Sequence, residues 1–475
     1  MSKSAIIGLA TLILLAGVLG WGLAICPWET MAGAALLALS GVFFWRTEAA
    51  FYFLVAYLPW QLALNLAPDI DLLSGRVLIL LLFLVWLIKA VKSGGLKTAR
   101  NQVAAGLILI LAVSLISLLV AQNPIWGARK WLVFASVFPL FFLTKHFISD
   151  WEKARQLIWV MSGSAALAAL AALGQFLSQF IWGLEKVMTW WGGQIAPWFL
   201  GWTFTQSVTQ NPSWLVEVGG QTIMRAIGLF PDPHMLAFFV GLVAPLSLAL
   251  MINEKGKRAW LLFFINCLFL VVLLLTFSRG GYLGLALGLM AMGITAWRHL
   301  AVKEKKFLGS FSILALIFIL LFGVPVLGRF FSSFDLAEGS NLGRLAIWQE
   351  SWAVFKTSPI LGVGLGNYPL ALDFDAGYRS AVTSHNLYLD ILAETGLLGL
   401  AAWGWFGCGF LRGAARKIKN QNRALVMLGS GVLGSGIYFL AHSFFETAIF
   451  NPTILAYLMI VAGLGALSLK KISKN

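Results

Sequence analysis

Uninterrupted apolar runs recur from one end of the chain to the other, and they limit its possible folds more than any other feature. One of them, LLFFINCLFLVVLLLTF, occupies residues 261–277 and contains no charged residue. Runs of about 17–25 apolar residues can cross the roughly 30 Å hydrocarbon layer of a bilayer. Lipid permits only helices or closed β-barrels, because backbone polar groups there need partners within the protein. The runs lack the apolar–polar alternation of barrel strands, so the sequence predicts an all-α bundle of membrane-spanning helices.

The composition agrees with this fold class. The chain is 60% apolar and 11% charged, with a mean hydropathy of +0.86, whereas a soluble domain is about one quarter charged. The first apolar run lacks a small-residue cleavage site with polar sequence after it, so we interpret it as a span rather than a secretory signal. We expect about 12–14 spans, and the fourteen candidates lie near 5–26, 30–45, 48–66, 75–91, 102–121, 129–147, 155–180, 235–252, 259–276, 280–297, 309–327, 386–411, 424–446 and 453–469.

Basic residues are distributed unevenly between alternate connections. One set of connections, together with Lys3 and Arg46, carries 24 of the 34 Lys and Arg residues, and the other set carries the remaining ten. Because cytoplasmic loops are enriched in basic residues, both termini are predicted to lie in the cytoplasm. Orientation explains most of the net charge of +15, so nucleic acid is not expected as a partner.

Only two connections are long, and both are predicted to be external. They divide the chain into N-terminal transmembrane helices (1–180), a first external loop (181–234), central transmembrane helices (235–327), a second external loop (328–385) and C-terminal transmembrane helices (386–475). Long loops on one side of a helical bundle commonly carry function.

The first external loop is rich in tryptophan. Its indole rings belong to Trp182, Trp190, Trp191, Trp198, Trp202 and Trp214. Two interpretations stay open: an aromatic belt at the membrane surface, or a platform on which sugar or lipid stacks.

The second external loop begins with a predicted amphipathic helix over residues 343–359. Its apolar stripe of Leu345, Trp348, Trp352 and Phe355 recurs at helical spacing, which predicts a helix lying in the membrane surface. The turn ILGVGLGNYP follows. Its alternating glycines do not match a nucleotide-binding pattern, and we expect them to allow a tight turn.

Four arginines and one histidine share the predicted external side. They are Arg225, Arg279, Arg344, Arg379 and His385. Arginine binds phosphate through a planar pair of N–H donors, and a neutral imidazole can accept a proton near neutral pH. The set therefore suggests an anionic, lipid-linked substrate. The three cysteines form no CxxC pair, so neither a zinc site nor a disulfide framework is indicated.

These residues resemble segments of the O-antigen ligase and O-antigen polymerase superfamily of bacterial membrane glycosyltransferases. The family pattern is His, then Asn, Ser or Gln, nine residues, Gly, two residues, and Gly, Thr or Tyr. His385-Asn386 is followed by nine residues, Gly396, two leucines and Gly399. The segments RAIGLFPDPH (225–234), TFSRGGYLGL (276–285) and GRLAIWQESWAVFKTSPILGVGLGNY (343–368) also resemble family segments.

The resemblance implies a GT-C-like fold and a metal-independent, inverting transfer of glycan from undecaprenyl diphosphate, with no cofactor. The reaction would take place on the external side of the bacterial inner membrane, in lipopolysaccharide or other cell-envelope polysaccharide biosynthesis, among membrane lipids. His385 matches the family's essential histidine, proposed as base. Arg225, Arg279 and Arg344 match arginines associated with the diphosphate, whereas Arg379 is added from its position alone.

Several alternatives stay open. A ligase would use lipid A core or a similar glycolipid as acceptor, a polymerase would use another glycan, and a protein acceptor is also compatible. The non-enzyme alternative is a solute transporter. Asp390 and Glu394 are costly inside a bilayer. They either orient a nearby His or Arg or form a structural pair. Asn386 is expected to be a further supporting residue. The DxD triplets at 69–71 and 373–375 are not expected to bind a metal.

Overall fold

The computed structural model describes residues 40–67, 70–93, 101–209, 212–302, 304–305, 309, 339–378 and 382–467. The described residues within 1–53 and 81–96 form one compact unit, and those within 54–80 and 97–475 form the other. In the first unit, Lys89 Nζ donates hydrogen bonds to Thr47 Oγ1 at 2.6 Å and to the carbonyl of Phe44. All of the predicted site residues that the structure describes belong to the second unit.

Membrane-spanning helices dominate, which confirms the predicted all-α class. Within the described residues, nine helices are long and apolar enough to cross a bilayer. They are α4 (Ser74–Lys92), α5 continued by η2 (Gln102–Val120), α6 with α7 (Pro124–Phe147), α8 (Trp151–Trp182), α12 (Pro233–Asn253), α13 (Lys257–Leu275), α14 continued by η5 (Arg279–His299), α19 (Leu387–Ile418) and α20 (Arg423–His442).

Two expected spans are shorter than predicted. The range near 48–66 contains only the 11-residue α3 (Thr47–Tyr57), because Pro59 and the strand that follows end the helix. The range near 453–469 contains α21 (Pro452–Ala466), whose 15 residues rise about 22 Å. The expected spans near 5–26 and 309–327, and most of that near 30–45, lie outside the described residues.

The first predicted external loop is a folded unit with its own core. After α8 come α9 (Leu184–Trp190), a π-helical turn η3 (Trp191–Ile195), α10 (Ala196–Leu200), α11 (Trp202–Thr209) and η4 (Pro212–Trp214). An antiparallel hairpin of β3 (Leu215–Val218) and β4 (Gln221–Met224) completes it. Its core contains Val187, Trp191, Ala196, Leu200, Val208, Trp214, Met224 and Ile227.

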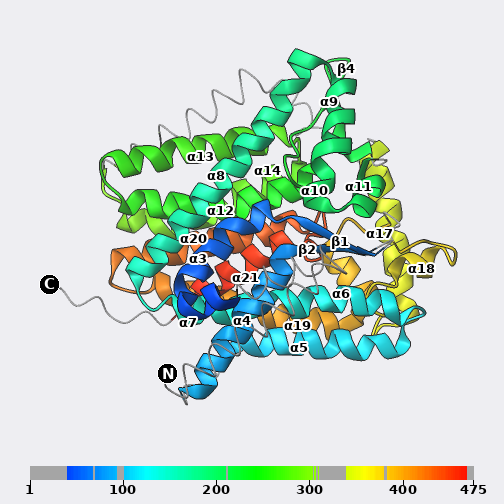
Figure 1. Cartoon of the computed structure of the whole chain (residues 1–475), viewed down its shortest axis with the longest axis horizontal. Coiled ribbons are helices and arrows are strands. Elements are labelled where there is room, and N and C mark those ends of the chain that lie inside the picture. The colour runs from blue at the N-terminus through cyan, green and yellow to red at the C-terminus, as the bar shows by residue number, and fades with distance from the viewer. Residues whose placement is uncertain are drawn as a thin grey trace, which may run out of the picture. The chain divides into compact units, whose positions relative to one another are not determined.

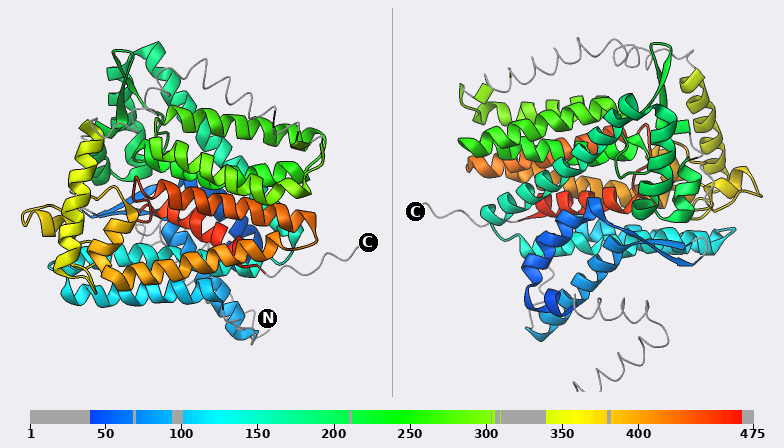
Figure 2. Two further views of the ribbon diagram at one scale, coloured as in Figure 1. Left: turned by 180° about the vertical axis from the view of Figure 1, so that it is seen from behind. Right: turned by 45° about the horizontal axis from the view of Figure 1, so that its top comes forward.

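A second hairpin pairs β1 (Ala63–Ala67) with β2 (Ile70–Leu73). The helices α17 (Gly339–Thr357) and α18 (Tyr368–Leu372) form the described part of the second predicted external loop. Figures 1 and 2 show α9–α11 and α17–α18 at the same end of the second unit. The described parts of the two long connections therefore lie at the same end of the second unit.

Candidate active site

His385 lies immediately before α19, where the chain turns sharply. Asn386 caps α19, because its side-chain oxygen accepts the N–H groups of Tyr388 and Leu389. His385 itself has a φ of +48°, and Phe277 is the other described non-glycine residue with positive φ. Such strained backbone persists only where the surrounding contacts hold it, and it is common at functional sites.

Glu446 binds the imidazole of His385. Nδ1 of His385 lies 2.9 Å from Oε2 of Glu446, in the connection between α20 and α21. This hydrogen bond, and then the negative charge of the same carboxylate, raise the pKa of His385. A carboxylate on Nδ1 favours the tautomer whose Nε2 carries the lone pair. The sequence did not point to Glu446, although an acidic residue at the end of an apolar run was a signal for it.

Asp390 holds both partners of this pair. Its Oδ1 accepts the backbone N–H of Ser384 at 2.9 Å, and its Oδ2 accepts the hydroxyl of Thr447. Ser384 precedes His385 and Thr447 follows Glu446, so one buried carboxylate fixes the chain on both sides of the contact. This geometry fits the alternative in which Asp390 orients a nearby histidine.

Glu394 forms a buried ion pair instead. Its Oε1 lies 2.7 Å from Nζ of Lys130 on α6, and its side chain is 4% exposed. The ammonium group of Lys130 also lies over the ring of Phe450, 4.0 Å from the centroid. This pair joins α6 to α19 without touching His385. The geometry therefore fits the alternative in which Glu394 forms a structural pair.

The first glycine of the histidine pattern marks a break in α19. Gly396 has φ +64° and ψ −161°, which are not helical. The backbone N–H groups of Leu397 and Leu398 instead donate to the carbonyls of Pro359 and Ile360. A Cβ at Gly396 would overlap the carbonyl oxygen of Ile360. Only glycine permits both the angle and the contact, so the pattern encodes a docked loop rather than close helix packing.

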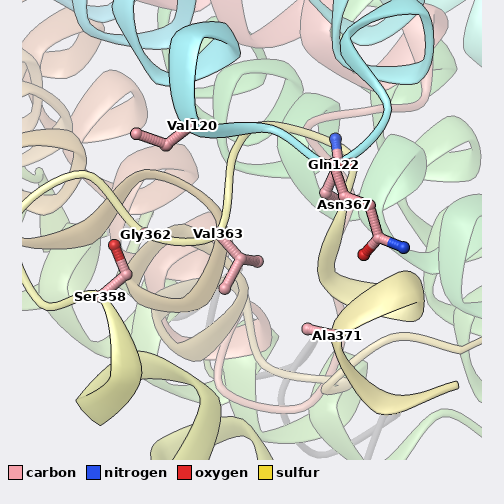
Figure 3. A pocket seen from close by; sticks show the side chains of 7 residues that line it. All are labelled: Val120, Gln122, Ser358, Gly362, Val363, Asn367 and Ala371. Carbon is pink, nitrogen blue, oxygen red and sulfur yellow. The ribbon is translucent and has the colours of Figure 1, made fainter. Parts of the chain in front are cut away.

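The glycine-rich turn that docks there behaves as expected. Gly362, Gly364 and Gly366 all have positive φ, and Val363 N donates to the carbonyl of Ala393 on α19. The turn also borders an uncharged cavity of ≈ 270 Å³ (Figure 3). The cavity is lined by Val120, Gln122, Ser358, Gly362, Val363, Asn367 and Ala371.

Helix α17 ends at Thr357, directly before Ser358 and Pro359, and its buried face differs from the predicted stripe. Ser351, Val354 and Phe355 are buried, while Leu345 and Trp352 are exposed. Trp348 points its indole N–H at the carbonyl of Ser384, 3.1 Å away. A tryptophan that the sequence assigned to the membrane surface therefore holds the backbone next to His385.

The tryptophans of the first loop fall into two groups. Trp191 donates to the carbonyl of Gly228, and Trp214 donates to that of Pro231. These buried rings anchor the RAIGLFPDPH segment. The exposed rings belong to Trp182, Trp190, Trp198 and Trp202, and the belt and platform interpretations both stay open for them.

Arg225 is buried and bound to backbone carbonyls. It is 8% exposed, its Nε donates to Thr276 O at 2.7 Å, and its Nη1 donates to Ser213 O at 3.0 Å. It thereby joins the RAIGLFPDPH segment to the TFSRGGYLGL turn. Its guanidinium acts electrostatically on Asp232. Burial and the negative charge of Glu446 together raise the pKa of Asp232 to about 6.

Arg344 and Arg279 are partly exposed. The charge of Arg344 opposes protonation of His385 and also acts on His442. Arg279 begins α14, directly after Ser278, whose hydroxyl lies 3.2 Å from Nε2 of His442. The structure therefore brings segments containing Arg225, Arg279 and Arg344 to His385. The fourth predicted arginine, Arg379, lies outside the described residues.

Each of the two DxD triplets has an aspartate that accepts a backbone N–H group. Oδ2 of Asp71 accepts the backbone N–H of Phe204, and Oδ1 of Asp373 accepts that of Asp375. Asp69 lies outside the described residues. Across the part of the chain that the structure describes, no three His, Cys, Asp or Glu side chains are grouped to hold a metal ion.

Comparison with known proteins identifies the segment that carries most of this site. The family model described as O-antigen ligase matches residues 262–404. This segment of the chain is therefore similar to the O-antigen ligase family. The matched segment contains Arg279, Arg344 and His385 through Gly399, whereas Arg225 and Glu446 lie outside it.

The chain is also similar to a curated bacterial protein. It is 26% identical over 230 residues to the exopolysaccharide production protein ExoQ of Rhizobium meliloti (strain 1021). The matched region covers 44% of this chain and 51% of that protein, so the chain spans about half of its curated relative. The apolar helices and the match to the O-antigen ligase model together support a multi-pass membrane protein.

Proposed function

We propose that the protein transfers a glycan from undecaprenyl diphosphate to a hydroxyl acceptor at the outer face of the bacterial cytoplasmic membrane. The reaction inverts the anomeric centre and uses no metal. The observation that carries the proposal is the 2.9 Å contact between His385 and Glu446, next to Arg344 and within an O-antigen ligase segment.

The His385–Glu446 pair supplies the base. With Nδ1–H donated to Glu446, the lone pair of Nε2 is available, and the side chain of His385 is 39% exposed. The acceptor oxygen attacks the anomeric carbon, the bond from that carbon to the diphosphate oxygen breaks, and the hydroxyl proton passes to Nε2. Glu446 stabilises the resulting imidazolium, as a carboxylate does in other histidine-based catalytic pairs.

Arginines hold the leaving diphosphate. It departs as an anion, so it needs positive charge more than it needs a proton. Arg279 and Arg344 are partly exposed, and the charge of Arg344 acts on His385; we assign the phosphate contacts to these two arginines. Arg225 is assigned a smaller share, because backbone carbonyls already bind two of its nitrogens. If the arginines suffice, a chelator leaves transfer unchanged.

The acceptor divides the proposal into two forms. In the ligase form the acceptor is lipid A core or a similar glycolipid, and in the polymerase form it is another lipid-linked glycan. The similarity to an exopolysaccharide production protein favours the second form. Offering each acceptor separately to the purified protein decides between them.

The test compares donor affinity with turnover for each purified variant. We expect His385→Ala to lose transfer by about 10²–10⁴-fold, the usual contribution of a general base, with near-normal donor binding. Arg279→Lys and Arg344→Lys should weaken donor binding, because lysine cannot bind a phosphate through two parallel donors. If His385→Ala retained turnover, or lost donor binding as severely as the arginine variants, the base assignment would be wrong.

A further inference from the structure

A continuous chain of hydrogen bonds runs from α20 to the first turn of α12. The hydroxyl of Tyr438 donates to the carbonyl of Ala237 at 2.5 Å and lies 3.0 Å from Nδ1 of His442. Nε2 of His442 lies 3.2 Å from Oγ of Ser278, which lies 2.9 Å from Nδ1 of His234. Neither the histidine pattern nor the proposed reaction uses this chain.

His442 is neutral in this setting. It is fully buried, and its ring stacks on Phe238 with centroids 3.7 Å apart. Within the described structure, its two ring nitrogens bond only to hydroxyl groups, those of Tyr438 and Ser278. Burying a charged group without a countercharge is strongly unfavourable, so one of its nitrogens carries a proton and the other carries a lone pair.

Counting the protons along this series of hydrogen bonds then determines which group donates in each bond. Tyr438 gives its single hydroxyl proton to a carbonyl, which has none to return, so its oxygen accepts Nδ1–H of His442. The lone pair of His442 is therefore on Nε2, and it accepts the hydroxyl proton of Ser278. Ser278 has no second proton, so its oxygen accepts Nδ1–H of His234. Neutral His234 consequently carries its lone pair on Nε2.

Nε2 of His234 belongs to the candidate site. His234 is partly exposed, and among described residues only Nδ1 of its ring has a hydrogen-bond partner. The charges of Arg225, Arg344 and His385 all act on its ring. A nitrogen without a proton cannot donate to a phosphate oxygen, but it can accept a hydrogen bond from a hydroxyl group.

We propose that His234 binds a sugar hydroxyl of the glycan next to the diphosphate, accepting its hydrogen bond at Nε2 while the arginines bind phosphate. The substrate class rests on the proposed function, but the tautomer does not. Ser278 and His442 are positioning residues, because they set the proton on His234 without facing the substrate.

The tautomer can be measured without any transfer assay. The chain contains only five histidines, so ¹⁵N-histidine labelling gives a small set of ring signals in lipid, and His234→Asn assigns those of His234. We expect a protonated Nδ1 and an unprotonated Nε2. Adding lipid-linked glycan should shift the Nε2 signal, whereas undecaprenyl diphosphate without sugar should not. A protonated Nε2 in the resting protein overturns the proposal, as does a shift caused by the diphosphate alone.

Two substitutions separate hydroxyl binding from a structural role. The amide of Gln reaches the position of Nε2, and that of Asn reaches the position of Nδ1. We expect His234→Asn to lose about tenfold in kcat/KM for the glycan, about one neutral hydrogen bond, and His234→Gln to lose less. The exposed His299→Asn serves as control. Equal losses, or a larger loss in His234→Gln, show that His234 acts through Ser278 and overturn the proposal.

Discussion

Replacing Glu446 with Gln tests the negative charge beside His385. The substitution keeps the size of the side chain and an oxygen that can accept Nδ1–H, and it removes the negative charge. Oε2 of Glu446 lies 2.9 Å from Nδ1 of His385, and Oε1 accepts the backbone N–H of Thr447. The single oxygen of Gln can keep the contact with Nδ1 of His385, but its amide nitrogen cannot accept the N–H of Thr447, so that hydrogen bond is lost. We expect the transfer rate to fall.

The magnitude follows from the contact. A hydrogen bond to a charged partner contributes about 1.5–3 kcal/mol. Since the side chain of His385 is 39% exposed, solvent screens the pair and the lower half of that range applies. We expect turnover to fall roughly 10- to 40-fold, with donor affinity nearly unchanged.

The sign of the pH effect is also determined. Glu446 raises the pKa of His385, and a base must be neutral, so wild-type turnover is lost as the pH falls through that raised pKa. In Glu446→Gln the pKa returns toward about 6.5, and the acidic limb of the profile moves to lower pH. The assay measures kcat with labelled donor across pH, with Glu185→Gln on the exposed face of α9 as control. An unmoved acidic limb with turnover within twofold of wild type would refute the pairing.

Three further predictions follow from other contacts. Gly396→Ala should prevent accumulation of folded protein in the membrane, because its Cβ would overlap the carbonyl of Ile360, whereas Gly404→Ala, where the added Cβ meets nothing within 4 Å, should accumulate normally. Lys130→Met alone should destabilise detergent-solubilised protein by about 3 kcal/mol in denaturant unfolding, and adding Glu394→Met should recover most of the loss, since the buried charge is then gone. In a cysteine-free background, Gln206→Cys should react with an impermeant thiol reagent outside intact cells and Val302→Cys should not; labelling of Val302→Cys alone would contradict the predicted orientation.

The membrane fold was predictable because hydropathy and length act locally. Each apolar run carries its own signal, and nine of the expected spans have long helices among the described residues. The ranges near 48–66 and 453–469 contain shorter helices, since mean hydropathy does not register where Pro59 or a β-strand ends a helix. The fold of the tryptophan-rich segment was missed because its core is assembled from short elements, none of which has a clear period.

The candidate site was predictable only in part. His385 and the arginines were proposed from residue type, predicted side and resemblance. The partner Glu446 was not, because 61 residues separate it from His385 and nothing local indicates their contact. The two acidic residues of α19 show the same limit: their spacing places both on one helix face, but their opposite roles depend on whether Thr447 or Lys130 lies opposite them.

Gly396 connects these observations. Its pattern with His385 reads as an active-site signature, yet the glycine does not approach the histidine; it lets the turn after Pro359 dock into α19. That turn follows α17, which carries Arg344 and whose Trp348 binds the carbonyl of Ser384. Asp390, between the histidine and the glycine, fixes the other side of Ser384. The spacing from His385 to Gly396 therefore sets the distance between the imidazole and the turn that follows the helix carrying Arg344, which gives a physical reason for both residues to occur in one pattern.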